Sequence, residues 1–176
     1  MFEGWEDFYL LVGSAAGALI GLLFVVVSLT SRMDRSSALR GVRVYMSPLL
    51  CTLALVLVMS GLAMVPELSR QEAAVVTTAA AVIGLAYGIF VVFLFRNLNM
   101  PEPTHWSDPW WYGLGPMVIY AALGGVAAVM WTDLEWAARA LAAVLMASMI
   151  LSIRNAWDLI TWIAPHPDDT PPPDQP

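Results

Sequence analysis

The chain has 176 residues, of which 59% are hydrophobic and 12% charged, and its mean hydropathy is +0.70. Soluble domains carry about 25% charged residues, so a water-soluble monomer of this length has too little polar surface for such a composition. These totals exclude a soluble globular enzyme and a disordered protein. Eight arginines face fourteen acidic residues, for a net charge of -6. This acidic balance argues against nucleic-acid binding, which needs a basic surface for the phosphates.

Five apolar runs divide the chain. Each has about 20 residues, enough for a helix to cross the roughly 30 Å hydrocarbon core of a bilayer. Peptide groups within lipid must be hydrogen-bonded inside their own segment, and the runs lack the alternation of barrel strands. We therefore predict an all-α membrane domain over residues 1–164 with five transmembrane helices. The predicted spans are 8–29, 44–65, 73–95, 112–131 and 136–153, the last with an extension to residue 163 left open.

Arginines beside the spans predict their orientation. Six arginines lie on one side of the predicted membrane and two on the other. Because cytoplasmic loops carry the excess of positive residues, we expect the N-terminus outside and the C-terminus inside. The first link would also attract anionic lipid headgroups, at about 1 kcal/mol per arginine, although its simpler interpretation is a topological anchor. This inner-leaflet basic cluster consists of Arg32, Arg35, Arg40 and Arg43.

The tail after the last span, residues 165–176, is rich in Pro and Asp. It has too few apolar residues to bury, so we predict a disordered cytoplasmic segment.

Groups that carry chemistry are missing from the middle of every predicted span. No Asp, Glu, Lys, Arg or His lies there, although proton pumps and many ion-coupled transporters need such groups near the membrane midplane. An intramembrane protease needs a nucleophile with a base or paired aspartates. The acidic groups around His105 and His166 lack a convincing metal-ligand spacing. We therefore predict a protein that is not an enzyme and uses no metal or cofactor.

Small residues recur at four-residue spacing in the first span. Gly13, Gly17 and Gly21 form a GxxxGxxxG pattern, which lets another helix approach closely within lipid. Two interpretations stay open: packing of the helices of one subunit, which is the commoner use, or a glycine zipper between the subunits of a homo-oligomer. Further packing candidates in the third and fourth spans are Gly84, Gly88 and Gly125.

A second pattern overlaps these glycines. Its residues follow three- and four-residue spacing, which places them on one face of a helix. In a symmetric pore lined by this span, the aromatic ring would form a dewetting constriction and the serines would wet the wall. Alternatively, the serines bond back to carbonyls four residues earlier. The pore-lining or helix-packing candidates are Ser14, Gly17, Gly21, Phe24 and Ser28.

The function expected from this face is a homo-oligomeric channel or pore for ions or small solutes, with the first helix facing the axis. The alternative is a non-conducting accessory or regulatory subunit of a larger membrane complex, with the same glycines receiving a helix of the partner.

The stretch FYLLVGSAAGALIGLLFVVVSL, residues 8–29, resembles the opening helix of a loose group of small bacterial multi-pass membrane proteins. The shared features are an aromatic pair, a turn of Gly and Ala, and the sequences GLLFV and SL. The resemblance covers about the first 30 residues and implies a location in the bacterial cytoplasmic membrane. The group has no established activity, so the resemblance implies no site residues.

Overall fold

A computed structural model describes residues 2–30, 46–97, 109–132 and 134–163. These ranges are almost entirely helical and contain no strand, which confirms the all-α prediction for the part of the chain they cover. The elements are α1 (Glu6–Thr30), α3 (Ser47–Ala63), α4 (Arg70–Asn97), the π-helix η2 (Pro109–Leu114), α5 (Gly115–Thr132) and α6 (Leu134–Ile163).

Four of the helices contain a stretch long and apolar enough to cross a membrane, and α3 is a fifth, shorter apolar helix. α3 has 17 residues, about 25 Å at 1.5 Å per residue, and ends two residues before the predicted end of its span. Pro48 occupies its first turn, where a missing N–H is tolerated, and Pro66 follows its end. By contrast, α6 continues without a break to Ile163, so one helix covers the fifth predicted span together with its open extension to residue 163.

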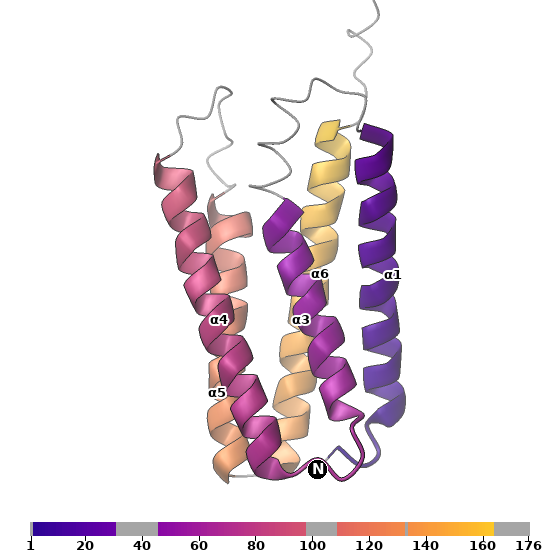
Figure 1. Cartoon of the computed structure of the whole chain (residues 1–176), viewed down its shortest axis with the longest axis vertical. Helices are drawn as coiled ribbons and strands as arrows, with labels where there is room; N and C mark the ends of the chain where they lie inside the picture. Colours follow the sequence, from indigo (N-terminus) through magenta and orange to yellow (C-terminus); the bar gives the residue numbers. More distant parts are fainter. Residues whose placement is uncertain (1, 31–45, 98–108, 133, 164–176) are drawn as a thin grey trace, which may run out of the picture.

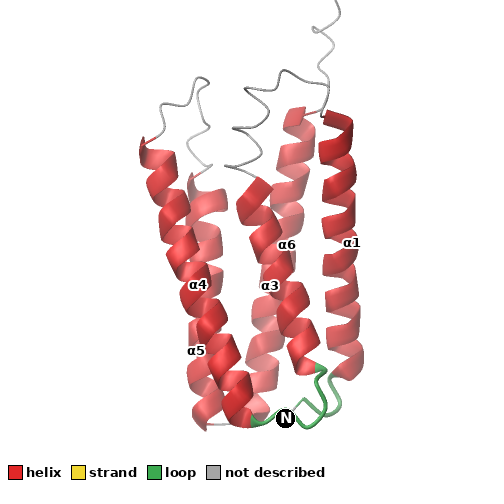
Figure 2. Cartoon of the chain, in the orientation of Figure 1, coloured by secondary structure: helices red, strands yellow, loops and turns green. Residues whose placement is uncertain are grey.

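The helices form one bundle with α1 and α4 at opposite edges and α3 between them (Figure 1). α1 packs against α3 and α6, α4 packs against α5, and α5 packs against α6. The loop between α3 and α4 lies at the same end of the bundle as the start of α1 (Figure 2). We call this the Tyr9 end, after a residue in the first turns of α1. The opposite end is the Asn155 end, after a residue in the last third of α6.

The turn that joins α3 to α4 is closed by a capping box. The Ser69 backbone N–H donates to the Glu72 carboxylate at 3.0 Å, and the Glu72 N–H donates to the Ser69 hydroxyl at 3.2 Å. This reciprocal pair satisfies two N–H groups that the first turn of α4 leaves without helical partners. The turn therefore fixes where α4 begins, and α3 and α4 run in opposite directions.

Glycines bring α4 and α5 close together. A Cβ atom at Gly84 would overlap the ring of Tyr120, and one at Gly88 would lie 2.5 Å from Cγ of Met117. The Tyr120 side chain is buried, so its ring occupies the space that Gly84 leaves. These two glycines therefore pack helices of the same chain. A Cβ at Gly125 would meet no atom of the described residues within 4 Å, so the packing role of this glycine stays a prediction.

Replacing Gly84 with Ala should destabilise the bundle, because the rigid Tyr120 ring has to move to admit the methyl group. We expect G84A to lower the free energy of unfolding by about 1–3 kcal/mol, the usual cost of overpacking a core. The matched control is G17A, where a Cβ meets nothing in the described structure within 4 Å and Ala is the better helix former. Reversible denaturant unfolding in detergent measures both, and equal stabilities for the two variants would contradict this packing.

Candidate functional site: the outward face of α1

The predicted stripe of the first helix lies on the side of α1 that faces away from the rest of the bundle. Ser14, Gly21, Phe24 and Ser28 are exposed, and Gly17 is half-buried. The Phe24 ring is 60% exposed, so it has little contact with its own chain. The structure thus brings these residues together on one open face, which we call the α1 face.

The three glycines of the GxxxGxxxG pattern do not share one environment. Gly13 is buried against α3, where a Cβ atom would lie 2.9 Å from Cβ of Ser60. A Cβ at Gly17 or Gly21 would meet none of the described atoms within 4 Å. At 3.6 residues per turn, positions four apart drift by about 40°, so the pattern rotates from the α3 contact toward the outside. Gly13 therefore packs within the chain, and Gly17 and Gly21 leave backbone open on the α1 face.

The two serines of the α1 face are exposed, and one of them is engaged with its own helix. The Ser28 hydroxyl donates to the Phe24 carbonyl at 2.8 Å, the back-bond to a carbonyl four residues earlier that serines in helices often form. The Ser28 proton is therefore engaged within α1. The chemical character of the α1 face is small and apolar, with Ser14 and Phe24 as its distinctive side chains.

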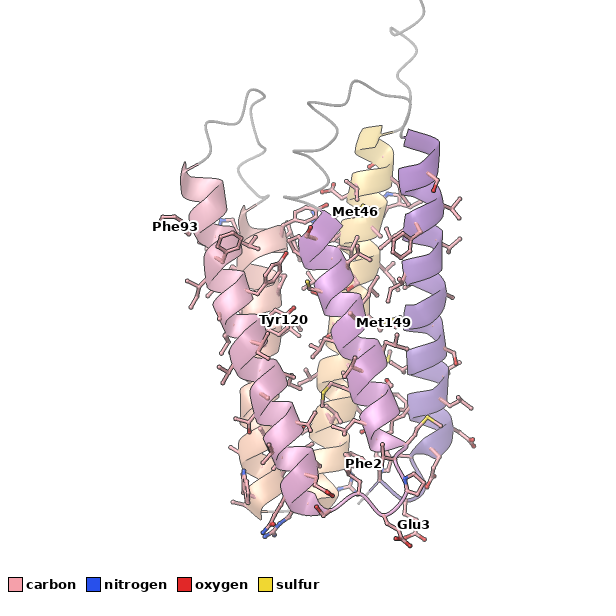
Figure 3. All side chains as sticks on the ribbon, in the orientation of Figure 1. Phe2, Glu3, Met46, Phe93, Tyr120 and Met149 are labelled. Atoms are coloured by element: carbon pink, nitrogen blue, oxygen red, sulfur yellow. The ribbon has the colours of Figure 1, made fainter. Side chains whose placement is uncertain are left out.

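An aromatic cluster fixes α1 at the Tyr9 end. The buried Tyr9 hydroxyl donates to the Ala138 carbonyl of α6 at 2.9 Å. The Phe2 and Phe8 rings meet the Tyr9 ring edge-on, with centroids 5.4 and 5.3 Å away, a favourable arrangement for aromatic pairs. Phe2 is seen at this end of the bundle in Figure 3. The start of α1 is thus tied to α6, which orients the α1 face.

A polar network that the sequence did not predict holds η2 against α6 at the Asn155 end. The Asn155 side chain is 2% exposed and donates from Nδ2 to the Trp111 carbonyl at 3.1 Å. The Tyr112 hydroxyl donates to the Asn155 carbonyl at 3.0 Å and contacts Asp158 Oδ2 at 3.2 Å. These bonds join segments more than 40 residues apart and fix the π-helix at the start of α5.

Arg154 completes the network. Its guanidinium lies 4.2 Å from the centroid of the Trp111 ring, donates to Asn155 Oδ1 at 3.2 Å, and stands 3.8 Å from Asp158. Arg154 and Asp158 are four residues apart on α6, which places them on one face of the helix within reach of each other. Both side chains are partly exposed, so the ion pair itself adds little to the free energy of unfolding. The spacing of Arg154 and Asp158 does not indicate that the amide of Asn155 is buried between these segments.

Polar side chains lie where α3 meets α4 and α5. Tyr87 of α4 lies beside Cys51 and Ser47, and Tyr120 of α5 lies beside Thr52. The Thr52 hydroxyl donates to the Pro48 carbonyl of its own helix at 2.9 Å.

Several sequence-based predictions fall outside the described residues. The basic cluster Arg32, Arg35, Arg40 and Arg43 lies there, as do the two groups around His105 and His166 and the whole tail 165–176. Among the residues that the structure describes, no three His, Cys, Asp or Glu side chains gather closely enough to hold a metal ion.

No protein-family model, curated protein or solved structure matches the chain. We therefore infer its function from the α1 face and from the contacts that orient it.

Removing the Asn155 amide should loosen the Asn155 end. N155A leaves the Trp111 carbonyl and the Arg154 guanidinium without this buried partner, so we expect a loss of about 1–3 kcal/mol in the free energy of unfolding. The control is T161A on the same helix, because the exposed Thr161 hydroxyl bonds carbonyls of α6 itself. Denaturant unfolding in detergent compares them, and an N155A variant as stable as T161A would refute the role of the network.

Proposed function

We propose that the chain is a multi-pass membrane protein that assembles with copies of itself into a pore, with the α1 face bordering the axis. The proposed location is the bacterial cytoplasmic membrane, with the N-terminus outside. The proposed permeant species are ions or small solutes. The observation that carries the proposal is the α1 face: a continuous stripe of small residues and one aromatic ring that the described part of its own chain leaves uncovered.

The outer surface of the bundle supports a lipid environment. Large apolar side chains on several helices are more than half exposed, including Leu11, Ile83, Val118 and Ile150. In water, apolar patches on this scale mark an interface or a membrane contact. The described arginines also suit the proposed orientation, since Arg70 and Arg139 belong to the Tyr9 end, which carries the smaller share of the positive charge.

The interior of the bundle favours a pore between copies over a path through one chain. The described core is filled by apolar side chains such as Leu53, Val56, Leu123 and Leu141, each at most 1% exposed. An aqueous path needs polar walls, and such a core supplies few polar groups to line one. Copies arranged around an axis would instead enclose a path between their α1 faces, and closed cyclic symmetry is the usual form of such assemblies.

The α1 face also suggests how the pore would work. Gly17 and Gly21 let neighbouring helices approach closely, so a ring of α1 helices can be narrow. The Phe24 rings would then meet near the axis and form an apolar constriction that holds back water. Asp7 is exposed at the Tyr9 end, and would add negative charge at the outer mouth.

Pore activity is tested by solute flux from liposomes that contain the purified protein. The wild-type protein should conduct, and F24A should raise the flux several-fold because it widens the apolar constriction. The matched control is F90A on α4, whose ring is exposed to a similar extent, 56% against 60%, but lies on a different helix. Tight liposomes with both wild-type protein and F24A, or an equal increase from F90A, would overturn the proposal.

The alternative is an accessory subunit that does not conduct. It is favoured by the Ser28 back-bond and by the apolar character of the α1 face, since both suit a partner helix better than a water column. In this case Gly17 and Gly21 would receive a helix of another protein.

Purification from native membranes separates these functions. An accessory subunit brings a foreign protein in fixed stoichiometry, and G17L should lose it because the new side chain blocks close approach. G61L is the matched control, since Gly61 on α3 is equally open in the described structure and is not a packing candidate. A purified homo-oligomer without any foreign protein would contradict the accessory role. So would a foreign protein that still co-purifies with G17L.

A further inference from the structure

Exposed tryptophans gather at the two ends of the bundle. Among the residues whose exposure the structure describes, each exposed Trp lies at one of these ends, and the rings are between 42% and 70% exposed. They stand on η2, α5 and α6, which pack against one another. Those at the Asn155 end are Trp110, Trp111 and Trp157, and those at the Tyr9 end are Trp131 and Trp136.

The two exposed rings of α6 are separated by the thickness of a membrane core. Trp136 and Trp157 are 21 residues apart within one unbroken helix. At 1.5 Å per residue this separation is about 31 Å along the helix axis. The hydrocarbon core of a typical bilayer is roughly 30 Å thick, so both rings can reach a boundary of the same bilayer.

The rings of η2 and α5 lie at the same two levels as those of α6. At the Asn155 end, the Asn155 amide donates to the Trp111 carbonyl at 3.1 Å, which places η2 beside a residue two positions before Trp157. At the Tyr9 end, Trp131 belongs to the last turn of α5 and Trp136 to the first turn of α6. Two neighbouring helices therefore carry exposed rings at matching levels.

Charged side chains of α6 stand next to these rings and not midway between them. Arg139 follows Trp136 by three residues and Arg154 precedes Trp157 by three, a spacing that puts each arginine on the face of its ring. Residues 140–153 carry no charge, and the exposed side chains among them are all apolar. An arginine one turn from a boundary can extend its guanidinium to the headgroups while its stem stays in apolar surroundings.

We propose that the exposed tryptophans of η2, α5 and α6 bind the two headgroup boundaries of a phospholipid bilayer, and so set the depth of the bundle and the membrane thickness that it prefers. An indole ring suits a boundary because its body is apolar and its N–H can donate to a lipid oxygen. The preferred hydrocarbon core is about 30 Å thick. This inference rests on the membrane location in the proposed function and does not depend on the pore.

A boundary at Trp157 also gives the polar network of the Asn155 end a physical setting. Arg154, Asn155 and Asp158 all lie within three residues of this ring. The partly exposed ion pair of Arg154 and Asp158 would then face headgroups and water, where charges are tolerated, and not acyl chains. The interhelical bonds of Asn155 would close the bundle at the edge of the hydrocarbon core.

Ring depth is measured by quenching of tryptophan fluorescence in vesicles of brominated phosphatidylcholine that contain the full chain. The bromine atoms lie either near the headgroup end of the acyl chains or near their methyl end. The signal of Trp157 is the difference between the wild-type protein and W157L. We expect shallow bromines to quench this signal about twofold more than deep bromines, because the ring lies at the boundary.

The matched control for depth is I150W on the same helix. Ile150 is 65% exposed and lies seven residues before Trp157, which is about 10 Å closer to the middle of the bilayer. The signal that this variant adds should be quenched more by deep bromines than by shallow ones.

The preferred thickness is measured by the midpoint of thermal unfolding, followed by far-UV circular dichroism in vesicles of phosphatidylcholine. The lipids carry monounsaturated chains of about 14, 18 or 22 carbons, and the wild-type midpoint should be highest at the middle length. W157L/I153W moves one ring inward by about 6 Å, and W157L/T161W moves it outward by the same distance. Both new sites are exposed on α6. The optimum should shift to shorter chains in the first variant and to longer chains in the second.

Three results would overturn the inference. Equal quenching of Trp157 by deep and shallow bromines would place its ring away from the boundary. No quenching of Trp157 in vesicles where I150W is quenched would place the ring in water or against protein. The same optimal chain length in both shifted variants would mean that the ring does not set the thickness.

Failure of the membrane location gives a different result, since neither Trp157 nor I150W would then be quenched by any brominated lipid. None of these readouts depends on solute flux, so the proposed pore keeps its own test.

Discussion

Apolar side chains on the outer surface of the bundle determine which environment this protein can occupy and which forces can hold its helices together. Ile83, Ile150 and Trp157 are each at least 65% exposed, and water does not tolerate such a surface on a monomer. Lipid does, but lipid also removes the hydrophobic force that would press the helices together. In the proposed setting, the bundle is held instead by close steric fit and by hydrogen bonds between helices.

The two sides of the bundle differ in how closely their helices pack. α4 and α5 fit through Gly84 and the Tyr120 ring, and the Asn155 network clamps η2 to α6. α1 is anchored by Tyr9 at one end, while an apolar groove lies between its other half and α3 and α6 in the described structure. In the proposed pore, less complete packing of α1 against the rest of the bundle would let this helix shift.

Much of the fold was predictable because apolar length and proline position are local properties of the sequence. The apolar runs predicted the helices, and Pro48 marks the first turn of α3. The early end of α3 is the main difference, since the apolar run continues to Val65 but the turn before Pro66 has already begun. The predicted orientation depends largely on arginines outside the described residues and stays a prediction.

The site was predictable only in part, because periodicity tells which residues share a face but not what that face meets. The spacing of Ser14, Gly17 and Phe24 places them on one side of a helix, yet only the packing of α1 on α3 shows that this side is open. Gly13 faces α3, unlike Gly17 and Gly21, because positions four residues apart rotate by about 40° around a helix. Asn155 could not be predicted as a buried polar residue because its partner Trp111 lies 44 residues away and no local sequence pattern connects them.

A cryo-EM image of the protein in lipid nanodiscs is the sharpest test of the proposed pore, since it shows the copy number and the helix nearest the symmetry axis. We expect a closed ring of identical chains with α1 innermost and the Phe24 side chains facing the axis. A single bundle without partners, or a ring with α4 or α5 innermost and α1 facing the lipid, would show that the α1 face does not border a pore.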